Sequence, residues 1–215
     1  MDELRLMYVT NPRDLEVNLN EIKRYLKVKE LDSSIMKVLD ESFSCVYSEA
    51  IPKAVYTQVP IKVGKTSVDF GFVKVRSFDL AEHLHGCDSA FVVAATLGIG
   101  IDKVVEKYIR ILQTKALVCD AIGSALIESF CNKLNKLLIT KKEAVSRFSP
   151  GYGDFDISYQ NIILEHLDAN KKVGITLTDS MMMIPSKSVT AIINLKKWWR
   201  YELKNIDSKG ICIFW

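Results

Sequence analysis

The chain has 215 residues, enough for one sizeable domain with its own core, so we expect a single domain over residues 1–215. Hydrophobic residues make up 48% and charged residues 26%, close to the average of globular proteins, which excludes a disordered or fibrous chain. The formal charge of +3, from 29 basic and 26 acidic residues, is too small to predict a nucleic-acid or membrane partner.

Five cysteines are spread along the chain without a CxxC pair, and their odd number argues against a complete disulfide framework. They are Cys45, Cys87, Cys119, Cys131 and Cys212. We expect reduced thiols in a cytoplasmic protein, and no metal site. The N-terminus lacks the pattern of a signal peptide, and no stretch of about 18 apolar residues is present to span a bilayer.

The first part of the chain predicts a strand, two helices and a β-hairpin. Residues 5–9 have the pattern of a short strand, and apolar side chains at helical spacing predict a helix over residues 15–28. A second helix begins after the capping sequence DSS and ends before Pro52. Residues 54–75 are rich in β-branched and aromatic side chains around a short GKT turn, which is typical of a hairpin.

The middle of the chain predicts a buried strand followed by two long helices. A short helix from residue 79 ends at Gly86. The nearly continuous apolar run of residues 89–98 predicts a strand buried on both faces, at the centre of a sheet. Helices follow over residues 102–113 and 115–138, and small side chains in the second suit a central helix with close packing.

The last part combines a helix with extended segments. We predict a helix of about three turns over residues 158–170, and two extended stretches over residues 173–195 that are broken at Pro185. The tail, residues 198–215, is apolar enough to dock on the domain. Because helices and strands occur in blocks rather than in strict alternation, we predict an α+β fold with a mainly antiparallel or mixed sheet and packed helices.

The sequence RFSPGYGDF, residues 147–155, is typical of a loop that lies against a ligand. Gly151 and Gly153 permit positive φ and leave backbone amides unshielded by any Cβ. Arg147 adds a permanent cation whose planar donors suit a carboxylate, and Tyr152 offers a hydroxyl. A turn that ends one helix and caps the next is the alternative. An Arg147 held in an internal ion pair, with a closed loop beside it and no adjacent cleft, would overturn the ligand hypothesis.

Other motifs favour structural roles. The sequence ATLGIGID lacks a phosphate-loop pattern, so we interpret it as a strand-to-helix turn capped by Asp102. Three consecutive methionines, residues 181–183, are typical of core packing, with adaptable contacts to a large ligand or partner as the alternative. His83 and His85 have poor spacing for a metal on a helix, and no nucleophile elbow is visible, so we name no catalytic residue.

These motifs together resemble those of a known family. The sequence RFSPGYGDF, followed by a helix and by VGITLTDSMMMIPSKSVTAII, is similar to the activation domain of cobalamin-dependent methionine synthase, and more closely to its free-standing bacterial relatives. The sequences AATLG and DAIGSALIE ahead of the loop extend the resemblance, which covers about residues 90–195.

The resemblance implies an α+β fold that binds S-adenosylmethionine and docks over the cobalamin of the synthase. Arg147 would then hold the carboxylate of S-adenosylmethionine. Ser149 and Gly151 would offer backbone contacts, and Tyr152 would lie near the space in which the methyl group is transferred. S-adenosylmethionine is thus the cofactor expected on this chain, and cobalamin the cofactor carried by the partner.

The same resemblance implies a surface that faces the cobalamin or the partner. Its residues are Gly153, Met183, Pro185, Ser186 and Ser188. The expected partner is a separately encoded cobalamin-dependent methionine synthase that lacks its own activation domain, with a flavodoxin-like protein as reductant. Asp69 and Asp79 are candidates for the family's acidic residue that meets the amino group of S-adenosylmethionine.

The main functional hypothesis is therefore an accessory protein for the reductive remethylation of cobalamin, which needs no general base of its own. One alternative is a non-enzymatic module that docks on a corrinoid protein without binding S-adenosylmethionine. A stand-alone methyltransferase is a third possibility, but the sequence shows no acid/base pair for a second substrate.

Overall fold

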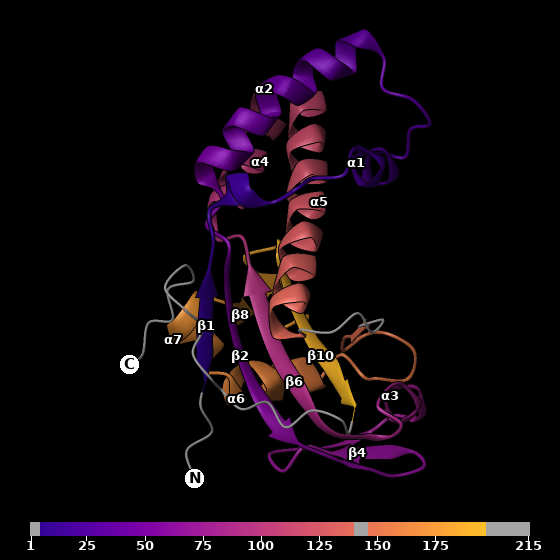
Figure 1. Cartoon of the computed structure of the whole chain (residues 1–215). Helices are drawn as coiled ribbons and strands as arrows, with labels where there is room; N and C mark the ends of the chain where they lie inside the picture. The colour runs from indigo at the N-terminus through magenta and orange to yellow at the C-terminus, as the bar shows by residue number, and fades with distance from the viewer. Residues whose placement is uncertain (1–4, 140–145, 197–215) are drawn as a thin grey trace.

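A five-stranded antiparallel sheet runs through the middle of the fold (Figure 1). The computed structural model describes residues 5–139 and 146–196. The strands are ordered β1-β2-β6-β10-β7, and every neighbouring pair is antiparallel. Their bounds are Leu6–Val9 (β1), Lys53–Pro60 (β2), Cys87–Thr96 (β6), Arg147–Phe148 (β7) and Ser188–Lys196 (β10).

Two small antiparallel sheets accompany the large one. A three-stranded sheet consists of β3 (Lys62–Val63), β4 (Ser67–Asp69) and β5 (Lys74–Arg76). A two-stranded ribbon consists of β8 (Thr176–Leu177) and β9 (Met183–Ile184), and it directly precedes β10 in the chain.

The helices lie on both sides of the large sheet (Figure 1). Those that pack against the first core are α1 (Leu19–Leu26), α2 (Ser33–Glu49), α4 (Gly100–Ile111) and α5 (Gln113–Leu138). Those that pack against the second are α3 (Phe78–His83), α6 (Tyr159–His166) and α7 (Ala169–Val173). A short 3-10 turn, η1 (Pro12–Asp14), precedes α1.

Strand β6 joins the two cores because its side chains alternate between the faces of the sheet. Phe91 and Val93 point into the first core, whereas Ala90 and Val92 point into the second. Strands β2 and β10 pair with β6 on its two sides. The prediction of a central strand that is buried on both faces is therefore confirmed.

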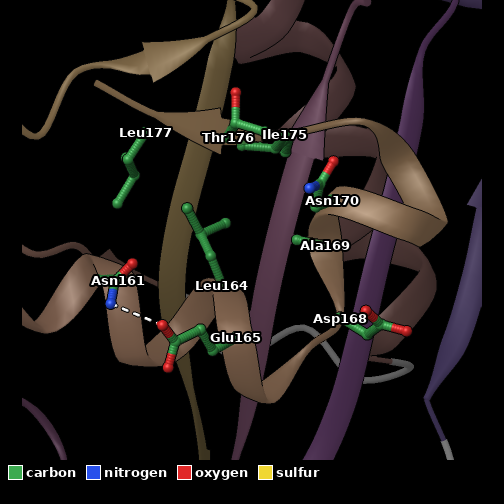
Figure 2. Close-up of a pocket in the computed structure, with 9 residues that line it drawn as sticks. All are labelled: Asn161, Leu164, Glu165, Asp168, Ala169, Asn170, Ile175, Thr176 and Leu177. Carbon is green, nitrogen blue, oxygen red and sulfur yellow. Dashed lines mark hydrogen bonds between the residues drawn. The ribbon is translucent and has the colours of Figure 1, made fainter. Parts of the chain in front are cut away.

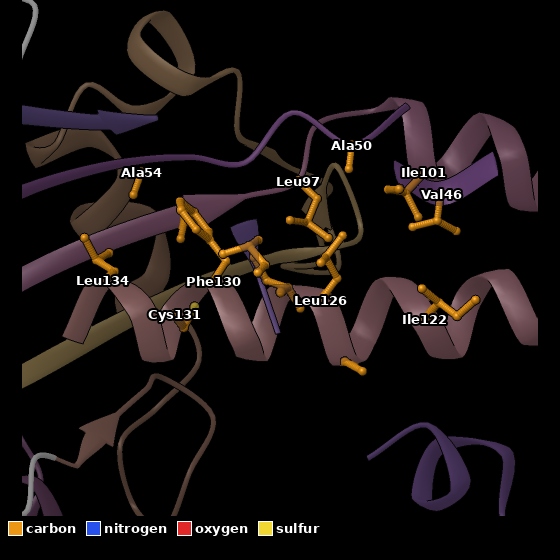
Figure 3. Close-up of a cluster of buried hydrophobic side chains, with 14 of the residues drawn as sticks. Val46, Ala50, Ala54, Leu97, Ile101, Ile122, Leu126, Phe130, Cys131 and Leu134 are labelled. Atoms are coloured by element: carbon orange, nitrogen blue, oxygen red, sulfur yellow. The ribbon is translucent and has the colours of Figure 1, made fainter. Parts of the chain in front are cut away.

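Helix α5 is the longest helix and forms one wall of the first core (Figure 3). Its side chains Ile122, Leu126, Phe130 and Leu134 follow one another along the face that meets the sheet and helix α2. Each of these side chains is at most 1% exposed. Buried residues extend round most of α5, and a narrow polar stripe with Asp120, Ser124, Glu128 and Asn132 remains.

The α+β class and the antiparallel main sheet agree with the sequence, but three local predictions need correction. Residues 54–75 do not form one hairpin: β2 joins the large sheet, and only its continuation β3 turns back into β4. The first helix begins at Leu19, after Asn18 caps it. The predicted helix over residues 158–170 is divided into α6 and α7 at Asp168, whose φ is 52°.

The predicted cap of helix α4 was also wrong. Ile99 occupies the N-cap position, and no side chain caps this helix. Asp102 instead accepts a hydrogen bond from the backbone amide of Ser186, at 3.1 Å. It therefore connects α4 to the turn before β10. The predicted docking of residues 198–215 lies outside the described residues.

Candidate functional site

Arg147 lies at the edge of the large sheet, where β7 pairs with Ile192 and Ile193 of β10. Its Nη1 donates to Asn132 Oδ1 at 2.9 Å, and its Nη2 donates to Glu128 Oε2 at 2.8 Å. The Arg147 side chain keeps 20% of its surface exposed. The cation is thus held in an internal ion pair, which meets the first part of the condition that would overturn a ligand role.

Helix α5 presents these acceptors because of their spacing in the sequence. Glu128 and Asn132 are four residues apart and Asn135 follows three residues later, so all three lie along one side of the helix. With its amide turned so that the oxygen faces Arg147, Asn135 accepts from Nη1 at 3.2 Å. None of these partners was expected from the sequence, although polar residues at this spacing in an apolar helix were a usable signal.

The loop after Arg147 is exposed at residues 151–154, so the closed-loop part of that condition is not met, although Arg147 lines neither of the two pockets described below. Gly151 and Gly153 have φ of 92° and 53°, as their positions in the motif predicted. Tyr152 between them is 68% exposed. Phe155 is buried in the second core and anchors the end of the loop.

The backbone amides of Gly151 and Tyr152 are used internally, so the prediction of an unshielded amide is wrong for Gly151. The Gly151 amide donates to the carbonyl of Phe155 at 2.7 Å, and the Tyr152 amide donates to the carbonyl of Ser149 at 3.2 Å. Glycine at positive φ closes the tight turn that makes these bonds. The amides of Gly151 and Tyr152 are therefore not available to a ligand in this arrangement of the loop.

The second half of the loop caps helix α3. The Asp154 carboxylate accepts from the hydroxyl of Ser77 and from the amides of Phe78 and Asp79. In return, the Asp154 amide donates to Asp79 Oδ2 at 3.2 Å. The Ser77 hydroxyl and the Phe78 amide hold the pKa of Asp154 below its ordinary value. The alternative hypothesis of a capping turn thus describes this half, except that the capped helix precedes the loop in the chain.

The two acidic candidates from the sequence have different places. Asp79 lies against the loop, where Gly153 leaves room for its carboxylate. Asp69 accepts from the amide of Gly71 at 2.8 Å in a turn of the small sheet. Only Asp79 therefore contacts the RFSPGYGDF loop.

The residues expected to face the partner lie around a turn between β9 and β10. Met183 belongs to β9, Pro185 is buried, and Ser186 is exposed. The hydroxyl of Ser188 donates to the carbonyl of Pro185 at 2.6 Å and lies 2.8 Å from the hydroxyl of Thr96, from which it can accept. We call residues 182–188 the β9–β10 turn.

The structure does not bring this turn next to Arg147. Arg147 pairs with Ile193, whereas Ser188 begins the same strand and pairs with Thr96. Five residues of extended strand separate Ser188 from Ile193, or about 17 Å at about 3.3 Å per residue. Gly153 is fixed near α3, so it does not belong to the β9–β10 turn either.

The three methionines divide between the two roles considered for them. Met183 is partly buried and packs against the second core. Met182 is 64% exposed. Met181 has a φ of 62°, and its carbonyl accepts from Gln160 Nε2 at 2.9 Å. Core packing therefore accounts for Met183, and Met182 is available for contact with another molecule.

A pocket of about 350 Å³ lies between α6, α7 and β8, and Figure 2 shows the residues that line it. Its floor is apolar, with Leu164 and Ile175, and its rim carries the carboxylates of Glu165 and Asp168. Asn161 donates to Glu165 at 2.8 Å across one side of the rim. None of the residues predicted for the site lines this pocket.

Another pocket, of about 440 Å³, lies beside the capping half of the loop. Asp154 lines it together with Phe78 and with Lys74 and Arg76 of β5. The two cations are two residues apart in a strand and so lie on the same face.

Within residues 5–139 and 146–196, no group of three metal-ligating side chains is suited to hold a metal ion. The helices of the same residues are too short or too polar to cross a membrane.

Residues 132–208 match the family model of the vitamin B12 dependent methionine synthase activation domain. The chain is also similar to the crystal structure of the MetH reactivation domain bound to AdoHcy, with a TM-score of 0.67 and 14% sequence identity. This similarity covers 89% of this chain and 78% of that one. The resemblance to the methionine synthase activation domain is therefore confirmed.

The activation-domain match includes both parts of the predicted site. The loop of residues 147–155 and the β9–β10 turn fall inside the matched range, whereas Glu128 lies just before it. At 14% identity, the similarity to the MetH domain shows the activation-domain fold and not the residues that bind a ligand. No curated protein matches the chain in sequence.

Proposed function

We propose that the protein binds S-adenosylmethionine beside Arg147 and delivers its methyl group to the cobalamin of a methionine synthase. The match to the activation-domain family supports this, and the MetH domain of similar fold was crystallised with AdoHcy, the demethylated product. The observation on this chain that carries the proposal is the Arg147–Glu128 pair at the base of an exposed loop.

The pair suits the amino-acid end of S-adenosylmethionine, which carries a carboxylate and an ammonium on one carbon. Arg147 would bind the carboxylate, and Glu128, whose side chain is 39% exposed, would accept from the ammonium. A cation and an anion 2.8 Å apart offer both charges within the span of one amino acid. The structure thus suggests Glu128, besides Asp79, as the acidic partner of the amino group.

Arg147 has donors left for a ligand. A guanidinium carries five N–H groups. Asn132 and Glu128 accept from two of them, and Asn135 accepts from a third in its turned orientation. Two donors remain with respect to the described residues, which is enough for the two oxygens of a carboxylate.

The loop supplies the other contacts in this proposal. The Ser149 hydroxyl and the Gly151 carbonyl can meet the hydroxyl and amino groups of the adenosine part, and Tyr152 faces the solvent side where a partner would approach. The methyl transfer itself takes place between the sulfonium of S-adenosylmethionine and the corrinoid, which a flavodoxin-like donor keeps reduced. The chain contributes orientation, for which a misplacement of about 1 Å can cost about a hundredfold in rate.

The partner would be a cobalamin-dependent methionine synthase that lacks its own activation domain. We place the reaction in the cytoplasm, where thiols remain reduced. The cysteines of the described residues fit that setting, since Cys45, Cys87, Cys119 and Cys131 are free thiols.

A second candidate function is docking on a corrinoid protein without binding S-adenosylmethionine. Two observations favour it: Arg147 already has an internal counter-ion, and the Gly151 and Tyr152 amides already have acceptors. Such a module would keep the activation-domain fold but would leave the methyl donor to another protein.

Calorimetry with S-adenosylmethionine separates the two functions. We expect saturable binding by the unaltered protein, weakened about 10- to 150-fold in Arg147→Ala, because a charged hydrogen bond contributes about 1.5–3 kcal/mol. Glu128→Gln should weaken binding about tenfold without loss of the Arg147 donors. Arg110→Ala is the control, because it removes a helical arginine paired with Glu106 on the exposed side of α4.

Two results of this experiment would count against the proposed site. No heat at millimolar S-adenosylmethionine, together with complex formation between the protein and a cobalamin-loaded synthase in sedimentation, would support the docking module. Equal binding by Arg147→Ala and Arg110→Ala would refute the proposed site even if S-adenosylmethionine binds elsewhere.

A further inference from the structure

The small three-stranded sheet presents a basic outer face beside the RFSPGYGDF loop. Its inner face is packed, because Val68 of β4 and Val75 of β5 are at most 1% exposed and belong to the second core. Successive side chains of a strand point to opposite faces, so Lys74 and Arg76 of β5 point outward. Both are exposed, and Arg76 lies opposite Ser67 of β4. The core thus fixes the strands that carry these two cations.

Positive charge is concentrated in this sheet. Residues 61–77 contain four basic side chains and one acidic side chain, whereas the whole chain has an excess of only three positive charges. The acidic residue, Asp69, lies opposite Lys74 and accepts from the amide of Gly71. Within residues 5–139 and 146–196, no ion pair includes Lys74 or Arg76. The two cations are therefore available to an anion from solution.

These cations line the pocket of about 440 Å³ described above. Sites for small molecules have volumes of about 300–1,000 Å³, so the pocket is large enough for one. Thr66 and Ser67 line it as well, and their hydroxyl groups make no hydrogen bond to the part of the chain that the structure describes. Cations and serine or threonine hydroxyls are groups with which proteins bind phosphate.

The start of helix α3 is not available to an anion in this pocket. The Asp154 carboxylate, which also lines the pocket, accepts from the amides of Phe78 and Asp79 and from the hydroxyl of Ser77. These three donors hold the carboxylate toward the helix. An anion must therefore be bound by side chains of β4 and β5, where the two cations outnumber the one carboxylate of the lining.

Phe78 adds an aromatic wall to the pocket. It is the first residue of α3, and 52% of it is exposed. The Arg76 amide donates to the hydroxyl of Tyr159 at 3.3 Å, and the Ser77 hydroxyl accepts from the amide of Leu80 at 2.9 Å. The junction that carries the cation and the ring is therefore held on both sides. An exposed ring in this fixed place can stack on a flat group of a ligand.

We propose that this pocket binds a small phosphate monoester that carries a flat ring. Arg76 donates to two phosphate oxygens through its planar donors, Lys74 meets the third oxygen, and Phe78 stacks on the ring. A phosphate monoester suits the lining better than a carboxylate, because it has up to two negative charges and three acceptor oxygens for the two cations and two hydroxyls. Arg147 does not line this pocket, and the inference does not rest on the proposed function.

A nuclear magnetic resonance titration of the isotope-labelled protein tests the site with phenyl phosphate, inorganic phosphate and phenol. We expect phenyl phosphate at millimolar concentration to cause saturable shifts of the amides of residues 66–78. Inorganic phosphate should bind about three- to tenfold more weakly, because it lacks the contact with the Phe78 ring. Phenol has the ring without the charge and should cause no saturable shift at the same concentrations.

Variants of exposed side chains assign the contacts. Arg76→Ala should weaken the binding of phenyl phosphate about tenfold or more, because charged hydrogen bonds are lost. Phe78→Ala should lower the affinity for phenyl phosphate to that for inorganic phosphate, because the ring contact is then absent.

Lys62→Ala is the matched control. Lys62 of β3 is an exposed cation opposite Asp69, on the same outer face of the sheet, and it does not line the pocket. Two strand spacings, or about 10 Å, separate β3 from β5, so its charge is largely screened from the pocket at about 0.15 M salt. Lys62→Ala should therefore change the affinity for phenyl phosphate less than about twofold.

The inference is overturned if phenyl phosphate causes no saturable shift at residues 66–78. It is also overturned if Lys62→Ala weakens binding as much as Arg76→Ala, since the attraction would then come from the charge of the whole face. Equal affinities for phenyl phosphate and inorganic phosphate would contradict the ring contact and the ligand class. If Arg76→Ala does not fold, Lys74→Ala takes its place. Calorimetry with S-adenosylmethionine, which has no phosphate, reports on the proposed function separately.

Discussion

The contact between Gly153 and Asp79 makes Gly153→Ala the sharpest test of how the ligand loop is held. An alanine Cβ at this position would lie 2.0 Å from Asp79 Oδ2 and 2.9 Å from Asp79 Cγ. The carboxylate would have to rotate away. Rotation breaks the hydrogen bond from the Asp154 amide and loosens the connection between the loop and α3.

The expected loss of stability has two parts. An L side chain at a φ of 53° costs about 1 kcal/mol relative to glycine. The hydrogen bond that Asp79 gives up costs about another 1 kcal/mol. Gly153→Ala should therefore lower the free energy of unfolding by about 2 kcal/mol, which corresponds to about 4–8 °C in Tm for a chain of this size.

Gly71→Ala provides the control, because Gly71 has a φ of 84° and nothing lies within 4 Å of its added Cβ. Gly71→Ala should therefore lower the free energy of unfolding by only about 1 kcal/mol, the cost of an L side chain at positive φ. Thermal unfolding followed by circular dichroism measures both variants. Equal Tm values for the two would refute the reasoning, since they would mean that Asp79 gives way at no cost.

Three further predictions concern the core and the titrating groups. Leu126→Ala should cost about 3 kcal/mol, because it leaves a cavity in the first core, whereas Leu117→Ala on the exposed side of α5 should stay within about 0.5 kcal/mol in the same urea titration. Burial raises the pKa of Cys131 to about 12, so iodoacetamide at pH 8 should label Cys45 and not Cys131, as peptide mapping would show. The free energy of unfolding should also fall above pH 9, because the thiol then ionises in the unfolded chain and not in the folded protein. A serine hydroxyl and backbone amides at the start of α3 lower the pKa of Asp154. The contribution of Asp154 to stability is therefore present above pH 4 and is lost as the pH falls through its folded pKa. Asp154→Asn should make Tm fall less steeply in acid, and an unchanged dependence of Tm on acid pH would contradict this.

The elements that could be predicted are those whose signal lies within one stretch of chain. The apolar run of β6 indicates two buried faces directly, and the length and small apolar residues of α5 indicate a central, closely packed helix. The predicted hairpin over residues 54–75 was only partly right, because its turn is a local signal and the pairing of its first strand is not. Its turn is real, since the amide of Gly64 donates to the carbonyl of Ser67 at 2.8 Å, but the pairing of β2 with β6 is a tertiary choice.

In the candidate site, too, the features set by local sequence could be predicted and those set by tertiary packing could not. Arg147 and the positive φ of Gly151 and Gly153 followed from local chemistry, because glycine and arginine have distinctive properties of their own. The partners of Arg147 did not, because Glu128 lies 19 residues earlier, on a helix whose packing against β7 no local pattern encodes. The amide of Gly151 was predicted to be open because a glycine has no Cβ, yet the turn that this glycine permits directs the amide to the carbonyl of Phe155.

The Arg147–Glu128 pair has little to do for folding, and this bears on its role. A salt bridge whose carboxylate is 39% exposed contributes about 0–1 kcal/mol, because solvent screens it and two long side chains must be ordered. Asn132 adds a further hydrogen bond to the same guanidinium. If Arg147 binds the methyl donor as we propose, these polar groups hold its guanidinium ready for a second anion. Glu128→Gln distinguishes these roles in one protein: a structural pair would show its effect in Tm, whereas a recognition pair would leave Tm within about 2 °C and change the affinity for S-adenosylmethionine.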